Sequence, residues 1–126
     1  MQIRQKQKLI RTALEDAKAL DITLLDVRQI SDFADLLAIA SGTSTRHVES
    51  IANRVVDALR ERGVRAMGVE GRGVGDWVLI DFGDVIVHVM RPPVRDFYNL
   101  EKLWSVGKEA ENDKHLHRQD AKSAKN

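Results

Sequence analysis

The sequence predicts an α+β sandwich: a mixed five-stranded sheet with helices mainly on one of its faces. Two long segments place apolar residues at helical spacing, and five shorter segments have the apolar runs or the alternation typical of strands. Their order, α-β-β-α-β-β-β-α with a short last helix, requires the second helix to cross over between strands. With 126 residues and 43% hydrophobic content, the chain is expected to form one domain over residues 1–105, followed by a polar tail over residues 106–126.

The first helix is predicted over residues 1–20. Its apolar residues share one helical face, opposite a face of Lys, Arg and Glu: Ile3, Ile10, Ala13, Leu14, Ala17 and Leu20. Such an amphipathic helix is expected to pack on the body of the fold. Strands follow over residues 21–27 and 35–40, and the nearly continuous apolar character of the second strand predicts burial on both faces.

A second amphipathic helix is predicted after the turn Gly42-Thr43-Ser44-Thr45. Ser44 or Thr45 can accept a backbone N–H as the N-cap, and Gly63 ends the helix. The apolar face recurs at helical spacing: Val48, Ile51, Ala52, Val55 and Leu59. The turn also resembles a phosphate-binding helix N-terminus, but it lacks the Lys of a Walker loop, so a structural role is favoured.

Three further strands are predicted over residues 64–70, 77–82 and 85–90. The glycine-rich residues 71–75 form a flexible loop, and residues 82–84 form a tight hairpin. The last strand has two faces, Val85-Val87-Val89 and Ile86-His88-Met90. The second of these faces is less apolar, so it is expected to be partly open.

The prolines at 92 and 93 end the last strand, and Pro93 is suited to begin a short helix with Phe97, Leu100 and Trp104 on one face. Residues 106–126 contain few apolar residues and many charged or amide side chains. A segment of this composition cannot bury enough apolar surface to offset its conformational entropy, so it is expected to be mostly disordered.

Charge is distributed unevenly along the chain. Residues 1–20 carry a net charge of +3, residues 21–105 a net charge of −3 and residues 106–126 a net charge of +1. RNA binding through phosphates needs clustered Lys and Arg, so the acidic body is better suited to a basic protein surface. No segment has the length and apolar character of a membrane span, and the absence of Cys excludes disulfides and fits a cytosolic protein.

Aromatic residues are scarce and concentrated. Five of the six lie between Trp77 and Trp104, and Phe33 is the exception. Phe82 and Phe97 are expected to close the core, whereas Trp77 has polar and glycine-rich neighbours. Trp77 is therefore either a core residue or a contact residue, since exposed Trp side chains often supply much of the energy of an interface.

One group of side chains permits an enzymatic hypothesis. Asp81, Asp84 and His88 surround the predicted hairpin and could hold a divalent cation for phosphoryl transfer. Asp81 and His88 would, however, lie on opposed strands, and Asp84 is more simply a turn residue that tolerates unusual backbone angles. The glycines at 71, 73 and 75 form GxGxG with no helical pattern after them, which does not predict a dinucleotide site.

Six strings in the sequence closely resemble the ribosomal silencing factor family, also called the Iojap family, and together they cover residues ~20–105. The strings are SGTSTRHV at 41–48, VEG at 69–71, DWV at 76–78, DFGD at 81–84, VHV at 87–89 and RDFYNLEKLW at 95–104. The resemblance implies a fold like a degenerate nucleotidyltransferase. This sequence lacks the paired Asp-x-Asp that metal-dependent nucleotidyl transfer requires, because two residues and not one separate the carboxylates in DFGD.

The resemblance also implies a role without catalysis, metal or cofactor. It implies binding to the large ribosomal subunit through the L-fourteen protein at the subunit-joining face, which blocks association with the small subunit and lowers translation when nutrients are scarce. It allows a homodimer in free solution and a minor contact with ribosomal RNA.

The residues expected to bind the partner lie in or beside these strings: Glu70, Gly71, Asp76, Trp77, Asp81, His88 and Met90. In this interpretation the carboxylates face a basic ribosomal protein, and Trp77 supplies an apolar anchor. Two other functions remain open on the sequence alone. One is a metal-dependent nucleotidyl or phosphoryl transferase, and the other is an RNA-binding module that uses the basic N-terminus.

Overall fold

A five-stranded mixed sheet forms the centre of the computed structural model, which describes residues 1–73 and 75–98. The strands lie in the order β1-β2-β5-β4-β3, with β2 and β5 parallel and the other neighbours antiparallel. Their bounds are Leu20–Asp26 for β1, Leu36–Ser41 for β2, Gly68–Glu70 for β3, Trp77–Asp81 for β4 and Val85–Met90 for β5. The predicted fold class is confirmed.

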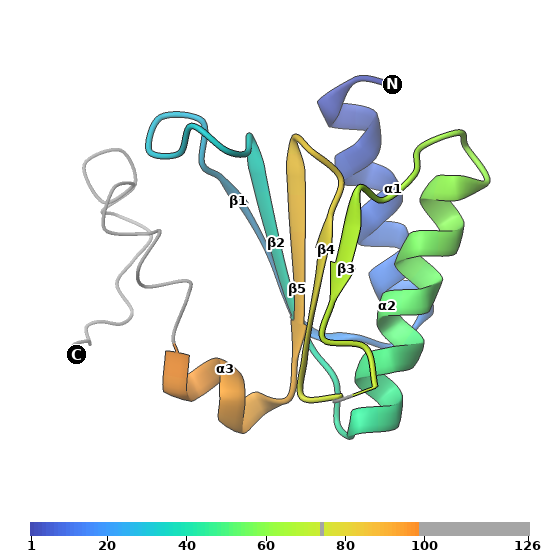
Figure 1. Cartoon of the computed structure of the whole chain (residues 1–126), viewed down its shortest axis with the longest axis vertical. Helices are drawn as coiled ribbons and strands as arrows, with labels where there is room; N and C mark the ends of the chain where they lie inside the picture. The colour runs from blue at the N-terminus through green and yellow to red at the C-terminus, as the bar shows by residue number, and fades with distance from the viewer. Residues whose placement is uncertain (74, 99–126) are drawn as a thin grey trace.

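Two amphipathic helices cover one face of the sheet, α1 (Ile3–Asp16) and α2 (Thr45–Arg60), as Figure 1 shows. Their apolar sides and this face of the sheet form the larger hydrophobic cluster, in which Leu14, Val55 and Val87 are fully buried. Ser44 is the N-cap of α2, because its Oγ accepts the His47 N–H at 3.1 Å. The second helix thus links β2 to β3 and crosses over the sheet, as the sequence predicts.

The first helix ends earlier than predicted, at Asp16 instead of residue 20. Lys18 takes a left-handed backbone conformation with φ of +64°, and its N–H donates to the Glu15 carbonyl while the Ala19 N–H donates to the Leu14 carbonyl. This is a Schellman ending, which usually has glycine at the left-handed position. Because lysine stands there, the sequence carries no stop signal, and Leu20 belongs to β1 instead.

The third strand is also shorter than predicted, because it begins at Gly68 and not at residue 64. The Val64 N–H donates to the Leu59 carbonyl at 2.9 Å, directly after Gly63 with φ of +84°. Val64 therefore completes the end of α2. Its alternating pattern with the residues that follow was not sufficient to place it in the sheet.

The second face of the sheet is less open than the sequence predicts. Met90 is fully buried and His88 is 8% exposed, while Ile86 is half-buried. The short helix α3 (Pro92–Tyr98) and the connection between β1 and β2 pack against this face, and Val27, Ala34, Leu37, Ile39 and Met90 form a second hydrophobic cluster. Figure 1 shows α3 on the side of the sheet opposite to α1 and α2.

The predicted domain of residues 1–105 and the predicted tail of residues 106–126 both extend beyond the described residues. Leu100 and Trp104, expected on one face of the last helix, also lie outside them, and only the backbone of Phe97 is described. In the described part of the chain, no helix is long and apolar enough to cross a membrane.

Candidate partner-binding surface

Five of the seven predicted contact residues share the face of the sheet that α1 and α2 do not cover. In an antiparallel pair, directly opposed residues point to the same face, and Trp77 opposes Met90, Leu79 opposes His88 and Asp81 opposes Ile86. Glu70 opposes Leu79 across the next pair and joins them. The term Trp77 face is used below for the exposed or half-buried members: Glu70, Trp77, Leu79, Asp81 and Ile86.

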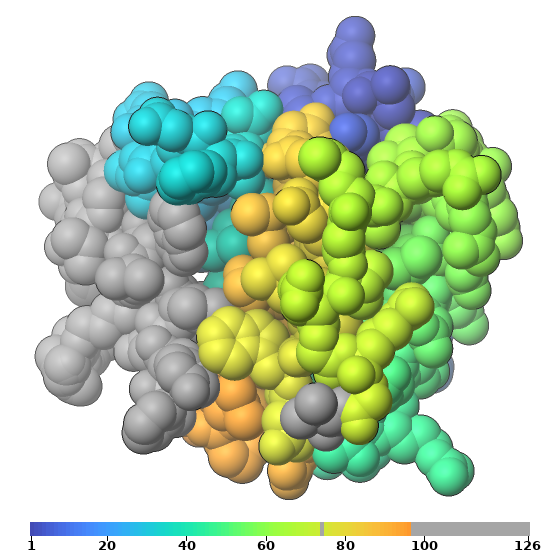
Figure 2. All heavy atoms as spheres, viewed as in Figure 1, coloured from blue at the N-terminus to red at the C-terminus, as the bar shows by residue number. Residues whose placement is uncertain are grey.

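The two other predicted residues lie at strand ends beside this face. Gly71 follows β3, and Asp76 precedes β4. The edge of the sheet formed by β3 and β4 is at the molecular surface, between α2 and α3, as Figure 2 shows. His88 and Met90 point to the same side of the sheet but are buried, so they lie beneath the surface that Trp77 forms.

Trp77 is half-buried and is held by a specific hydrogen bond. Its Nε1–H donates to His88 Nδ1 at 2.9 Å, and the two ring centroids are 5.8 Å apart with an interplanar angle of 49°. The polar edge of the indole is therefore bound to the sheet, while part of the side chain remains accessible. The sequence left a core role and a contact role open, and the structure shows a ring that is packed on the sheet and still partly accessible.

His88 accepts this hydrogen bond as a neutral imidazole. Because Nδ1 is the acceptor, the ring proton must be on Nε2. Burial lowers the pKa of His88 from 6.5 to about 4, since the charged form is disfavoured away from water. The acceptor is thus available at neutral pH.

Gly71 allows β3 and β4 to approach each other at the edge of the Trp77 face. Its φ is +92°, and a Cβ at this position would lie 2.1 Å from the Trp77 carbonyl oxygen. No residue with a side chain fits without moving one of the strands. The position of the Trp77 backbone therefore requires a glycine at position 71.

The glycine-rich loop, expected to be flexible, is anchored on α2 through its described residues. The Gly73 N–H donates to Glu49 Oε2 at 2.5 Å, and Arg72 Nη2 donates to Asn53 Oδ1 at 2.9 Å. A Cβ on Gly75 would lie 2.6 Å from the Cβ of Thr45. These contacts hold the chain that leads into Trp77 against the first turns of α2.

Two carboxylates give the Trp77 face its acidic character. Glu70 is exposed, and Asp81 is half-buried with its Oδ1 accepting the Gly83 N–H at 2.7 Å. Asp76 lies 3.4 Å from Arg91 Nη1, and the Arg91 N–H donates to the Asp76 carbonyl. Since Arg91 offsets the charge of Asp76, the acidic character of this region comes mainly from Glu70 and Asp81.

The residues of the metal hypothesis have separate structural partners. Asp84 lies 2.8 Å from Lys6 Nζ of α1, and Asp81 binds the backbone of the hairpin. The positive φ of the hairpin is at Gly83, at +92°, and not at Asp84. Within residues 1–73 and 75–98, no group of three or more His, Cys, Asp and Glu side chains is placed to hold a metal ion.

His47, which sequence reasoning missed, occupies the turn that resembles a phosphate site. Its Nδ1 accepts the Thr43 N–H at 2.9 Å, and its Nε2 lies 3.0 Å from the Ala17 carbonyl oxygen. Ser44 Oγ accepts the His47 N–H, so side chains already occupy two of the backbone N–H groups of this turn. The turn therefore joins the end of α1 to the start of α2.

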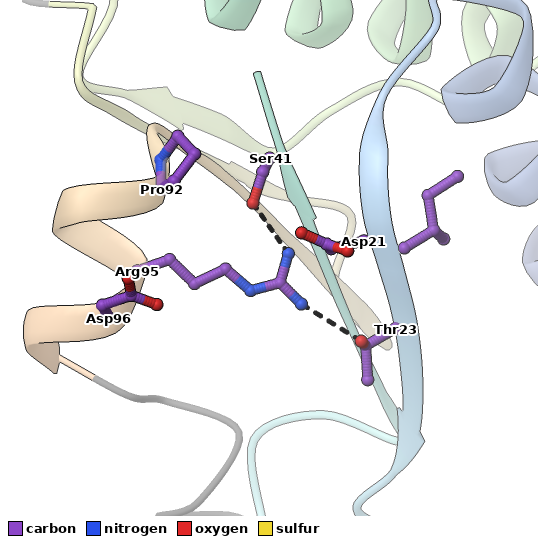
Figure 3. Close-up of a pocket in the computed structure, with 7 residues that line it drawn as sticks. Asp21, Thr23, Ser41, Pro92, Arg95 and Asp96 are labelled. Atoms are coloured by element: carbon purple, nitrogen blue, oxygen red, sulfur yellow. Dashed lines mark hydrogen bonds between the residues drawn. The ribbon is translucent and has the colours of Figure 1, made fainter. Parts of the chain in front are cut away.

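Arg95 was also missed, and it lines a pocket of about 460 Å³ beside β1, β2 and α3 (Figure 3). Arg95 is 7% exposed, and its guanidinium donates to Ser41 Oγ at 2.8 Å and to Thr23 Oγ1 at 3.1 Å. Asp21 and Asp96 also line the pocket. The two hydroxyls connect α3 to the sheet, which fixes the chain directly after Met90.

The full chain, residues 1–126, matches the family model described as "Ribosomal silencing factor during starvation". The chain belongs to the ribosomal silencing factor family. A family member from Chromobacterium violaceum, named ribosomal silencing factor, is 46% identical over 104 residues, which are 82% of this chain and 85% of the relative. The names of this family and of its members refer to the regulation of translation and to association with the ribosome.

Two further similarities extend this assignment. A crystal structure of a protein from Chromobacterium violaceum has a TM-score of 0.82 and 46% identity, over 83% of this chain and 88% of that chain. A relative from Mus musculus named mitochondrial assembly of ribosomal large subunit protein 1 is 33% identical over 78% of this chain, which corresponds to 44% of its own length. The relatives of this chain thus include a longer protein whose name refers to the large ribosomal subunit.

Proposed function

We propose that this chain binds the large ribosomal subunit through the Trp77 face and contacts the L-fourteen protein at the subunit interface. Binding there blocks association with the small subunit and represses translation when nutrients are limited. The role is non-catalytic and requires no cofactor. Family membership supports the association with the ribosome, and the mouse relative's name supports the choice of the large subunit.

The observation that carries the choice of surface is the orientation of Trp77. Its indole is held by His88 and remains partly accessible on the face of the sheet that also carries the carboxylates of Glu70 and Asp81. A fixed aromatic side chain with acidic neighbours suits a basic protein, because the ring supplies apolar contact and the carboxylates supply electrostatic complementarity. Ribosomal proteins are generally basic.

Sedimentation of the purified protein with separated ribosomal subunits tests the proposal. We expect the protein to pellet with the large subunit alone and to inhibit subunit joining. Trp77→Ala should weaken this binding by about thirtyfold, the effect of losing a hot-spot side chain worth about 2 kcal/mol. The control is Leu20→Ala, which removes an exposed apolar side chain from β1, at the opposite edge of the sheet.

Other outcomes of the same experiment would contradict the proposal. Wild-type binding and wild-type inhibition by a folded Trp77→Ala variant would exclude the Trp77 face. Magnesium-dependent nucleotide turnover that requires Asp81 would favour a transferase. Binding to free RNA with a steep dependence on salt, and without ribosomal protein, would favour an RNA-binding module that uses the basic N-terminal helix.

A further inference from the structure

The Trp77 side chain lies along the sheet instead of standing out from it. Trp77 directly opposes Met90, yet its indole nitrogen reaches His88, whose own opposed residue is Leu79. The indole therefore spans to the diagonal neighbour on β5, a distance that large aromatic side chains can bridge. In this position the ring tilts against the imidazole, with the two planes at 49°.

The hydrogen bond is chemically specific. An indole N–H is only a donor, and a half-buried donor needs an acceptor. His88 supplies that acceptor from beneath the surface, where it is 8% exposed. A leucine at position 88 would keep the apolar packing but would leave the indole N–H without this partner.

We propose that His88 is a positioning residue for the partner-binding surface: it fixes the Trp77 indole in one orientation before the partner binds. This inference rests on the proposed function. Binding immobilises interface side chains at a cost in conformational entropy, and a side chain that is already fixed avoids that cost. His88 thereby contributes to affinity through Trp77, without contacting the partner.

Three substitutions at position 88 separate positioning from packing. In His88→Asn, the amide oxygen occupies a position close to that of the imidazole Nδ1, so an acceptor is retained. In His88→Leu, the acceptor is removed. In His88→Gln, a polar side chain is retained, but its acceptor is one bond further from the backbone. We expect the Leu and Gln variants to bind the large subunit about five- to tenfold more weakly, and the Asn variant to bind within about twofold of wild type.

The indole N–H resonance of Trp77 reports the orientation directly, and its assignment follows from the spectrum of Trp77→Phe. In the wild-type protein and the Asn variant, we expect this proton to be protected from exchange with water. In the Leu and Gln variants, it should exchange faster while the backbone spectrum remains that of a folded protein. A residue that only stabilised the fold would lower the unfolding midpoint without changing the affinity of the folded protein.

Wild-type affinity in a folded Leu or Gln variant, with an unprotected Trp77 indole proton, would overturn the inference. So would an Asn variant that keeps the protected proton but binds as weakly as the Gln variant. If the Leu variant does not fold, the comparison of Asn with Gln decides. Failure of the proposed function looks different, because Trp77→Ala would then bind normally.

Discussion

The protonation of His88 makes the stability of the fold depend on pH. Its pKa is about 4 in the folded protein and 6.5 as a free side chain, so between these values the unfolded state binds a proton that the folded state does not. The free energy of unfolding must therefore rise as the pH increases from about 4 to 6.5, and His88 contributes up to about 3 kcal/mol to this rise. Outside this pH range, the titration of His88 does not change the stability.

Urea unfolding at pH 4.5 and pH 7 measures this contribution. Carboxylates also titrate at low pH, so His88→Asn is the control that retains them and lacks the imidazole. We expect the wild-type protein to lose more free energy of unfolding than the Asn variant when the pH is lowered. Equal losses in the two proteins would show that His88 is not held neutral by the fold.

Gly71 and Gly73 form a matched pair for testing the approach of β3 to β4. Both have positive φ, +92° and +87°, but an added Cβ would meet the Trp77 carbonyl at Gly71 and nothing within 4 Å at Gly73. We expect Gly73→Ala to cost about 1–2 kcal/mol of backbone strain. Gly71→Ala should cost about 1–3 kcal/mol more, because the strands must separate. Chemical denaturation measures both, and equal costs would contradict the close approach.

At the scale of the secondary-structure elements, Arg95 determines how α3 is held on the sheet. Its guanidinium reaches Ser41 of β2 and Thr23 of β1 from a largely buried position. Arg95→Lys should lose about 1–3 kcal/mol of unfolding free energy, because a single ammonium group cannot reproduce the planar fork of donors. Asp96→Ala is the control, since this neighbour is exposed. Equal unfolding free energies of the wild type and the Lys variant would refute this role.

The elements that the sequence predicts well are those with a complete local pattern. The apolar face of α2 lies between Ser44 and Gly63, and both ends agree with the structure. The end of α1 was missed because Lys18 adopts a conformation typical of glycine. In each case the local backbone signal decided the accuracy of the predicted boundary.

The candidate site depends on long-range contacts that the sequence shows only in part. Alternation along β5 correctly separates His88 from Val87, but it cannot show that α3 covers the face to which His88 points. The partners of Arg95 are 54 and 72 residues away in the sequence, so no local spacing predicts them. The face that the candidate residues of one strand pair share was therefore predictable, whereas the contacts that support these residues were not.

At the scale of the whole molecule, charge differs between the two sides of the sheet. The helix α1 carries Arg4, Lys6, Lys8 and Arg11 against two acidic residues, whereas Glu70 and Asp81 lie on the opposite face. If the Trp77 face binds a basic protein, Glu70→Gln with Asp81→Asn should weaken binding to the large subunit and reduce its dependence on salt. The asparagine keeps the oxygen that accepts the Gly83 N–H.

Glu15→Gln provides the control for this prediction, because it removes an exposed carboxylate from α1 on the other side of the sheet. Association rates of all variants are measured at two ionic strengths. We expect a slower association for the double variant at low salt, and no change for the control. A double variant with faster association would indicate that this face meets an acidic partner.

The Trp77 and His88 pair lies within the single hairpin formed by β4 and β5, joined at Gly83. Hairpins close within microseconds, whereas the parallel pairing of β2 with β5 must bring together two strands that α2, β3 and β4 separate in the chain. The two aromatic rings can therefore meet early during folding, from contacts that are local in the chain. An isolated hairpin is only marginally stable, so the arrangement of the two rings is stabilised when β2 pairs with β5. We therefore expect the Trp77 and His88 pair to form before β2 supports it.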